Sequence, residues 1–260
     1  MKQTKDFITV KMLISYNYLF VLIIADLTNS SFSFATFPSI FKLASVILID
    51  KKGDKSNTWN YRPISTLPAL SKIFERALYL RLIHLFTDNS IFNPAQLGFT
   101  KHKSTQDEII NLTEFIYNAF NCKKISLNVF IDYQKAFYTI NHSILLCKLE
   151  VYGIRGYPLE IIRSYSIGRQ QIVKYNKCLP VGRVISCGIP QGILLGPILF
   201  LVYINDLPNF SDSCHSLLFA DDTTLSLTNH DLTSLIISTN IKVDKFITWS
   251  KSNRLSVSPD

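Results

Sequence analysis

Two adjacent aspartates, Asp221 and Asp222, constrain this chain more than any other feature. They lie within residues 216–227, between two short apolar or β-branched runs. Such runs on both sides of a polar turn predict a β-hairpin, so we expect the two carboxylates at its tip. Acidic side chains at a strand end can bind a hard cation such as Mg²⁺. Taken alone, such a pair is more often a solvated polar turn, so the rest of the chain must decide.

A third acidic residue follows another predicted strand. Residues 127–131 form a short, mostly apolar run, and Asp132 comes directly after it. A helix is predicted to begin near Asn141 and to end at Gly153. An acid between a buried strand and a helix can point into a site, although an isolated aspartate there more often marks a helix start.

The composition predicts a folded chain. Of its 260 residues 47% are hydrophobic and 18% are charged, which excludes general disorder. The length allows one large domain or two small ones. The five cysteines are odd in number and form no Cys-x-x-Cys pair, which argues against a zinc site or a disulfide framework. This pattern suits a reducing compartment.

The positive charge is concentrated in one region. Residues 51–103 carry nine Lys or Arg and three acids, so they hold six of the eight surplus charges of the chain. Such a region predicts a polyanionic partner, with a solvated surface as the alternative. It contains a lysine-rich predicted hairpin tip at 51–55, and Arg62, which precedes a proline and is therefore biased to an extended backbone. Arg62 suits a phosphate clamp, or else a plain surface position.

Residues 1–30 are the hardest to interpret. An unbroken apolar run from Tyr18 to Ala25 follows three lysines. It is far shorter than the roughly 20 residues that a membrane-spanning helix needs. A signal peptide is the alternative, but no convincing small-residue cleavage site follows the run. We therefore expect a buried helix at the edge of the domain and no stable membrane association.

Apolar spacing predicts the remaining elements. Strands are predicted over residues 42–50, 170–175 and 179–185, and helices over 70–85, 158–165, 197–207 and 232–249. Another helix, capped by Ser104 or Thr105, should run past Ile116. Residues 188–197 contain three glycines and two prolines, so we expect a buried, shaped turn there.

Twelve short segments occur together in a recognisable order. They include Phe219-Ala-Asp-Asp-Thr223, and the others are residues 51–55, 60–65, 71–75, 96–99, 104–105, 130–132, 135–137, 141–142, 188–192, 195–200 and 203–207. With these segments the chain resembles the reverse transcriptase domain of LINE-type (non-LTR) retrotransposons. The resemblance extends from about residue 30 to the end of the chain.

This resemblance implies an α+β fold of the right-hand polymerase type, with an antiparallel palm sheet backed by helices. Residues 1–30 would form an N-terminal segment and 31–260 the reverse transcriptase domain. Within it we expect the fingers over about 40–125 and the palm over about 126–260, with part of 150–190 as a candidate to return to the fingers. The thumb is expected to be missing or truncated.

The resemblance also implies RNA-directed DNA polymerase activity, with two Mg²⁺ ions as cofactors. Its catalytic and metal-binding residues would be Asp132, Asp221 and Asp222. The chemistry is an in-line displacement at phosphorus, in which charge builds on the equatorial and leaving oxygens. Two cations can activate the primer 3′-hydroxyl and neutralise the pyrophosphate, which explains a need for clustered carboxylates.

Other roles are implied at matching positions. The partners would be an RNA template, a DNA primer and deoxynucleoside triphosphates. Phe137 would lie under the incoming sugar and exclude a 2′-hydroxyl by its bulk, with a core phenylalanine as the alternative. The basic residues of 51–103 would line the template path. The implied nucleotide-binding residues are Lys51, Lys52, Lys55, Arg62, Phe137 and Gln191.

Some positions depart from the family's pattern. Tyr138 stands where relatives usually carry an acid, Ile193 where they carry a serine, and Thr100 where they carry an arginine. The alternative function is therefore a catalytically inactive, truncated retroelement remnant that at most binds nucleic acid. In either case we expect an intracellular location, in the nucleus or the cytoplasm.

Overall fold

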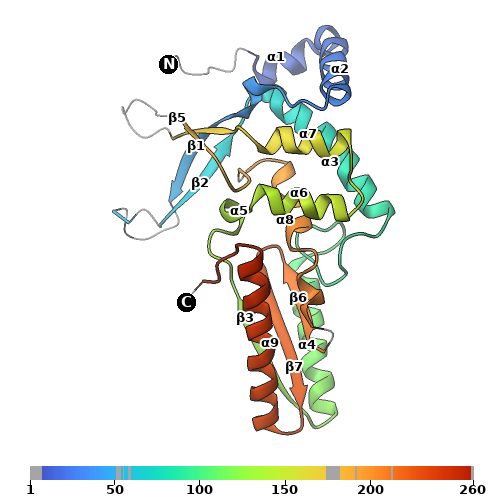
Figure 1. Cartoon of the computed structure of the whole chain (residues 1–260), viewed down its shortest axis with the longest axis vertical. Helices are drawn as coiled ribbons and strands as arrows, with labels where there is room; N and C mark the ends of the chain where they lie inside the picture. Colours follow the sequence, from blue (N-terminus) through green and yellow to red (C-terminus); the bar gives the residue numbers. More distant parts are fainter. Residues whose placement is uncertain are drawn as a thin grey trace.

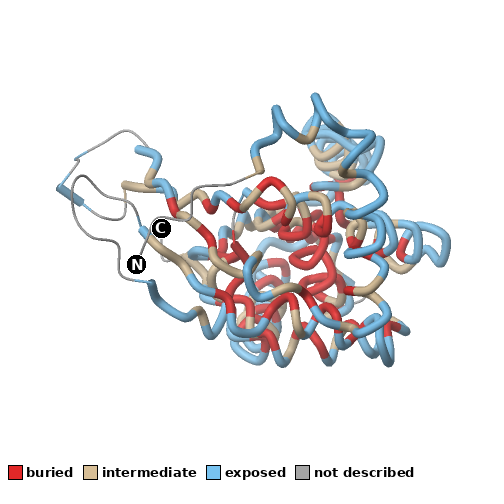
Figure 2. The backbone as a smooth tube through the Cα atoms, turned by 90° about the horizontal axis from the view of Figure 1, so that it is seen from above, coloured by how far each residue is buried: buried red, intermediate tan, exposed pale blue. Residues whose placement is uncertain are grey.

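Two β-sheets with helices between them make up the structure. It is a computed structural model that describes residues 8–50, 54, 56–57, 60–173, 182–190, 192–211 and 213–258. One sheet lies in the upper part of the molecule and the other in the lower part, and the buried residues gather in the middle (Figures 1 and 2).

The four-stranded sheet has the order β2-β1-β4-β5. Strands β1 (Leu43–Asp50) and β2 (Tyr61–Thr66) form an antiparallel pair. Strand β4 (Gln170–Val173) runs parallel to β1, and β5 (Gly182–Val184) is antiparallel to β4. Residues from 170 onward therefore rejoin a sheet that begins at residue 43, and β2 forms one edge of it.

The three-stranded sheet has the order β3-β7-β6 and is antiparallel throughout. Its strands are β3 (Ile125–Ile131), β6 (His215–Phe219) and β7 (Asp222–Asn229). Helix α9 (Leu232–Ser252) lies in front of this sheet and α4 (Thr105–Asn121) behind it (Figure 1). A capping box made by Ser104 and Asp107 begins α4, as the sequence predicts.

Helix α8 (Leu195–Ile204) forms the centre of the core, because nine of its ten residues are buried. It contacts α3 (Ala69–Asp88) and α6 (His142–Val151), and α6 contacts α7 (Tyr157–Ser166). Three further helices are short: α5 (Ala136–Thr139), η1 (Ser39–Lys42) and η3 (Leu207–Phe210).

The start of α8 differs from the prediction. Proline was expected at the first helical position, but the helix begins two residues earlier, at Leu195. A proline within the first turn removes no intrahelical hydrogen bond, so the sequence permits either start. Residues Gly188 to Pro190, before this helix, are buried and irregular, in agreement with the predicted turn.

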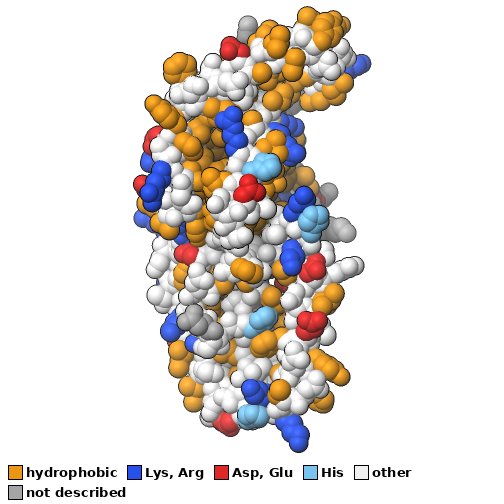
Figure 3. All heavy atoms as spheres, turned by 90° about the vertical axis from the view of Figure 1, so that its right-hand side faces the viewer, with side chains coloured by type: hydrophobic (Ala, Val, Ile, Leu, Met, Phe, Trp, Pro, Cys, Tyr) orange, Lys and Arg blue, Asp and Glu red, His pale blue; other side chains and the backbone are white. Residues whose placement is uncertain are grey.

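The N-terminal segment is helical but not buried, so that part of our expectation was wrong. It forms α1 (Val10–Ser15) and α2 (Asn17–Ser33), in which only Thr28 and Ser31 are buried. Apolar residues surround α2 on all sides, whereas it packs against the domain on one side only. Figure 3 accordingly shows hydrophobic side chains gathered at the top of the molecule. Within the described residues, no helix combines the length and apolar character needed to cross a bilayer.

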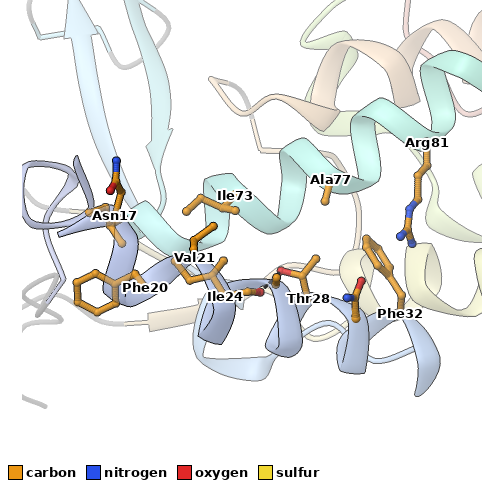
Figure 4. A pocket seen from close by; sticks show the side chains of 12 residues that line it. Asn17, Phe20, Val21, Ile24, Thr28, Phe32, Ile73, Ala77 and Arg81 are labelled. Carbon is orange, nitrogen blue, oxygen red and sulfur yellow. Dashed lines mark hydrogen bonds between the residues drawn. The ribbon is translucent and has the colours of Figure 1, made fainter. Parts of the chain in front are cut away.

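A shallow apolar groove separates α2 from α3. Val21 and Ile24 on α2 face Ile73 on α3 (Figure 4). At one end, the Arg81 guanidinium lies over the Phe32 ring, 3.7 Å from its centroid. This stacked arginine ties α2 to the domain and covers part of its apolar surface.

A buried polar cluster joins α3, α7 and the residues after α7. Tyr165 donates a hydrogen bond of 3.0 Å to Glu75 Oε1, and Arg169 Nη1 donates one of 3.2 Å to the Tyr165 carbonyl. All three side chains are at most 1% exposed. Burial raises the pKa of Glu75, whereas the Arg169 charge and the Tyr165 hydrogen bond lower it. Arg169 therefore helps to keep a buried carboxylate ionised.

We predict that Arg169→Met destabilises the fold in a pH-dependent way. Without the guanidinium the pKa of Glu75 in the folded state should rise further. In the unfolded chain its pKa is about 4.3, so above that pH the buried carboxyl increasingly lowers the free energy of unfolding. The free energy of unfolding should fall by about 3 kcal/mol at pH 8 and by less at pH 5. Thermal melts at both pH values measure this. Adding Glu75→Gln should restore stability mainly at pH 8, and equal losses at both pH values would contradict the prediction.

Candidate active site

Three aspartates meet at one end of the three-stranded sheet. Asp132 follows β3, and Asp221 and Asp222 lie at the turn between β6 and β7. Ile131 pairs with Thr223, so the next positions, Asp132 and Asp222, are neighbours across the two strands. The hairpin tip that the sequence predicts is confirmed, and the register brings the third acid to it.

The turn that carries the aspartates is strained and held from outside. Ala220 has φ of 57°, a left-handed value that is uncommon for a residue with a Cβ atom. Its amide donates a hydrogen bond of 3.1 Å to the buried Gln96 Oε1, which also accepts one of 2.8 Å from the Gly98 amide. Gln96 therefore fixes the turn from a distant part of the chain.

Glycine is needed at position 98 because the backbone passes very close to the turn. A Cβ atom there would lie 2.1 Å from the Ala220 amide nitrogen. The neighbouring residues add strand-like pairing, since the Leu97 amide donates to the Leu218 carbonyl at 2.8 Å and the Leu218 amide donates to the Ala95 carbonyl at 2.9 Å. Residues 95–98 thus brace β6 and the aspartate turn together.

The two aspartates at the turn have raised pKa values. Burial raises the pKa of Asp221, and the charges of Asp222 and Asp132 raise it further. Burial and the Asp132 charge likewise raise the pKa of Asp222. Like charges held together at the end of a sheet raise the free energy of the folded state unless a cation neutralises them. This electrostatic pattern is typical of functional sites.

The donor set suits a divalent cation, although the ligands are not pre-assembled. Among the residues that the structure describes, no three His, Cys, Asp or Glu side chains are gathered closely enough to hold a metal ion. Magnesium is usually bound by one or two carboxylates together with substrate phosphates and water. The oxygen chemistry and mutual repulsion of the three aspartates therefore fit Mg²⁺ that arrives with substrate.

A positive charge from the other sheet acts on this cluster. Arg62 lies exposed on β2, and its charge lowers the pKa of Asp221, which opposes the larger effect of burial. The edge strand of the four-stranded sheet therefore faces the aspartate end of the three-stranded sheet. An arginine at this position can bind phosphate oxygens close to the carboxylates.

Phe137 lies at the border between the site and the core. It is 9% exposed, and its ring stacks on that of Phe200 with the centroids 4.6 Å apart. The ring of Phe99, which is 56% exposed, contacts it edge-on at 6.4 Å. This position is compatible with a sugar platform and with the alternative of a core residue.

Four of the predicted nucleotide-binding residues lie outside the described part of the chain. They are Lys51, Lys52, Lys55 and Gln191. Their assignments stay predictions.

A fourth acid near the site was not predicted. Glu108 lies in the first turn of α4, where burial and the charge of Asp222 raise its pKa. The alternation along β6 and β7 puts Asp222 on the same sheet face as His215, whose ring stacks on Phe115 of α4. This helix therefore covers the face that carries Asp222.

Comparisons with known proteins agree with this geometry. Residues 49–260 match the family model described as reverse transcriptase (RNA-dependent DNA polymerase). Two Drosophila melanogaster relatives are each 31% identical: the probable RNA-directed DNA polymerase from transposon BS, over 92% of this chain and 27% of that protein, and the one from transposon X-element, over 78% and 23%. The RNA-directed DNA polymerase from mobile element jockey of the same species is 28% identical over 88% of this chain and 26% of that protein.

Solved structures show the same fold. Telomerase from Candida albicans, in complex with a fragment of telomeric RNA, superposes with a TM-score of 0.61 at 15% identity, over 90% of this chain and 45% of that one. Apo telomerase from Candida tropicalis gives 0.59 at 13% identity, over 85% and 44%. At such low identity these matches establish the fold alone.

The fold is of the right-hand polymerase type, as predicted. The chain belongs to the reverse transcriptase (RNA-dependent DNA polymerase) family, and the resemblance to the non-LTR retrotransposon enzymes is confirmed. The chain spans about a quarter of the length of these curated relatives.

We predict that Asp221→Asn stabilises the protein when divalent metal is absent. A carboxyl whose folded-state pKa is raised costs stability as the pH rises above its unfolded value of about 3.9. Removing the charge should raise the melting temperature by about 2 °C at pH 7.5 in EDTA, and by less at pH 4. Asp231→Asn is the control, because Asp231 is an exposed cap residue whose carboxylate accepts a hydrogen bond from the Ser234 amide, which lowers its pKa. A lower melting temperature for Asp221→Asn at pH 7.5 would contradict the prediction.

Proposed function

We propose that this chain is an RNA-directed DNA polymerase domain, which adds deoxynucleotides to a primer 3′-hydroxyl on an RNA template. The observation that carries the proposal is the convergence of Asp132, Asp221 and Asp222 at one sheet end, where burial and repulsion raise carboxylate pKa values. Family membership supports the reaction class, and the RNA template, DNA primer and deoxynucleoside triphosphates are the proposed partners.

In this proposal Asp132 and Asp221 hold two Mg²⁺ ions, and Asp222 supports them. The ions, when bound, supply Lewis-acid activation of the primer hydroxyl and neutralise the leaving pyrophosphate. Asp132 follows β3 and Asp221 precedes β7, and these two strands pair, so the sheet limits how far the two carboxylates can separate. The Gln96 hydrogen bond to the Ala220 amide limits how far Asp221 can shift during the reaction.

Arg62 is the proposed contact to the triphosphate, together with one of Lys51, Lys52 or Lys55. A guanidinium binds phosphate oxygens in a fixed fork, and the effect of the Arg62 charge on Asp221 supports this role. Gln191 is proposed to contact the incoming nucleotide or the template. The basic residues of 51–103 are proposed to line the template path, which gives salt-dependent binding.

We also propose the domain division that the resemblance implies. Residues 31–260 would form the polymerase domain, with fingers over about 40–125 and a palm over about 126–260. The pairing of β4 with β1 supports assigning residues 170–184 to the fingers. An intracellular location, in the nucleus or the cytoplasm, suits these substrates and the four described cysteines, which are free thiols.

Primer extension on poly-rA with an oligo-dT primer tests the proposed activity. Purified chain with Mg²⁺ should extend the primer, and Asp132→Ala should reduce the rate at least about a hundredfold, because the cations lose a ligand worth several kcal/mol. Asp231→Asn, at the cap of α9, should extend normally. Salt-sensitive RNA binding without Mg²⁺-dependent extension would replace the proposal with the inactive remnant.

The sugar-platform role of Phe137 predicts a change in substrate choice. Phe137→Val should remove the bulk beneath the 2′-carbon and raise ribonucleotide use relative to deoxynucleotide use by about 10-fold to 100-fold. Ratios of kcat/KM for UTP and dTTP measure this. Phe86→Val, at a fully buried position away from the site, is the control for lost core packing. An unchanged ratio in Phe137→Val would leave Phe137 as a core residue.

A further inference from the structure

We propose that Tyr138 is a positioning residue that ties the loop after Asp132 to strand β2 and thereby sets the position of Arg62. This inference rests on the proposed function, because it assumes that the triphosphate is bound between Arg62 and the aspartates. It concerns a residue at which the chain departs from the family's pattern.

A direct hydrogen bond joins Tyr138, in the segment after Asp132, to strand β2. Tyr138 Oη donates to the Pro63 carbonyl oxygen at 2.5 Å. Pro63 is the next residue after Arg62 on β2, and Tyr138 lies in α5, six positions after Asp132. Burial raises the pKa of Tyr138 to about 12, so the phenol keeps its proton throughout the neutral range.

The segment that carries Tyr138 is held rigidly by backbone contacts. A Cβ atom at Gly188 would lie 2.5 Å from the Tyr138 carbonyl oxygen, so the two backbones are in close contact. The Gly188 amide donates to the Ile140 carbonyl and the Ile189 amide donates to the Phe137 carbonyl, both at 2.7 Å. His142 Nε2 also hydrogen-bonds the Gly188 carbonyl, at 2.7 Å. Tyr138 therefore projects from a fixed base.

The other end of this hydrogen bond lies on β2, a strand that has little other support. β2 is an edge strand, paired only with β1 within the described sheet. Arg62 is exposed, so little packing of its own side chain holds it near Asp221. A hydrogen bond to the adjacent Pro63 carbonyl fixes the backbone from which the guanidinium extends.

The residue type matters for this role. An ionised carboxylate, which the resemblance would lead us to expect here, only accepts hydrogen bonds and would repel a carbonyl oxygen. A tyrosine donates, and it also reaches further. The departure at position 138 therefore creates a contact to β2 that an acid at neutral pH cannot make.

Tyr138→Phe removes the hydroxyl and leaves the ring. We expect the KM for dTTP to rise about fivefold in poly-rA/oligo-dT extension, with kcat within twofold and an unchanged Kd for primer–template. The matched control is Tyr203→Phe, because the Tyr203 hydroxyl donates to the Asn253 carbonyl at 2.6 Å, away from β2. This control should lower the melting temperature but leave the KM unchanged.

A double-mutant cycle tests whether Tyr138 acts through Arg62. Arg62→Ala alone should raise the KM for dTTP, and adding Tyr138→Phe should raise it no further. An additional, independent fivefold rise in the double variant would overturn the positioning role, as would an unchanged KM in Tyr138→Phe.

Hydrogen exchange separates this inference from the proposed function. Amides of residues 60–66 should exchange faster in Tyr138→Phe than in wild type and in Tyr203→Phe. Unchanged exchange would overturn the tie whether or not the chain is active. If wild type shows no Asp132-dependent extension, the proposed function fails. Fluorescently labelled dTTP binding then decides the inference: weaker binding in Tyr138→Phe supports it, and unchanged binding overturns it.

Discussion

Repulsion among three clustered carboxylates is the constraint on which the arrangement of this molecule depends. Asp132, Asp221 and Asp222 raise the energy of the folded state by lying together, as the raised pKa values of the pair at the turn indicate. The fold must therefore hold them by contacts that do not involve the carboxylates. It does so through backbone pairing of β3 with β7 and through the Gln96 side chain.

The stability that offsets this cost lies in the middle of the molecule. Helix α8 is buried on almost every side, and α3, α6 and α7 are arranged around and beside it. The aspartates lie at the border of this core, where Phe137 stacks on Phe200 of α8. A rigid core directly beside the aspartates keeps their carboxylates in a fixed geometry. A cation would then bind to them without a cost for rearranging the ligands.

The sequence predicts only those features of this site that follow from residues close together in the chain. The hairpin at Asp221 and the strand before Asp132 follow from apolar runs beside polar turns. Only the family resemblance, and not the periodicity, indicates that these strands are neighbours. The role of Gln96 was not predicted, because its contact spans 124 positions in the sequence. Burial of the N-terminal helix was predicted wrongly, since an apolar run does not reveal how many of its sides will be covered.

In the proposed function, phosphate binding and cation binding belong to different sheets, so their alignment would have to come from contacts between the sheets. Arg62 lies on an edge strand whose partners are far from the aspartates in the sequence. The hydrogen bond from Tyr138 to Pro63 crosses that boundary, and Tyr138 is a residue that the resemblance marks as a departure from the family's pattern. A different residue at such a position can therefore be another way of joining β2 to the segment after Asp132. It need not mean that the active site has been lost.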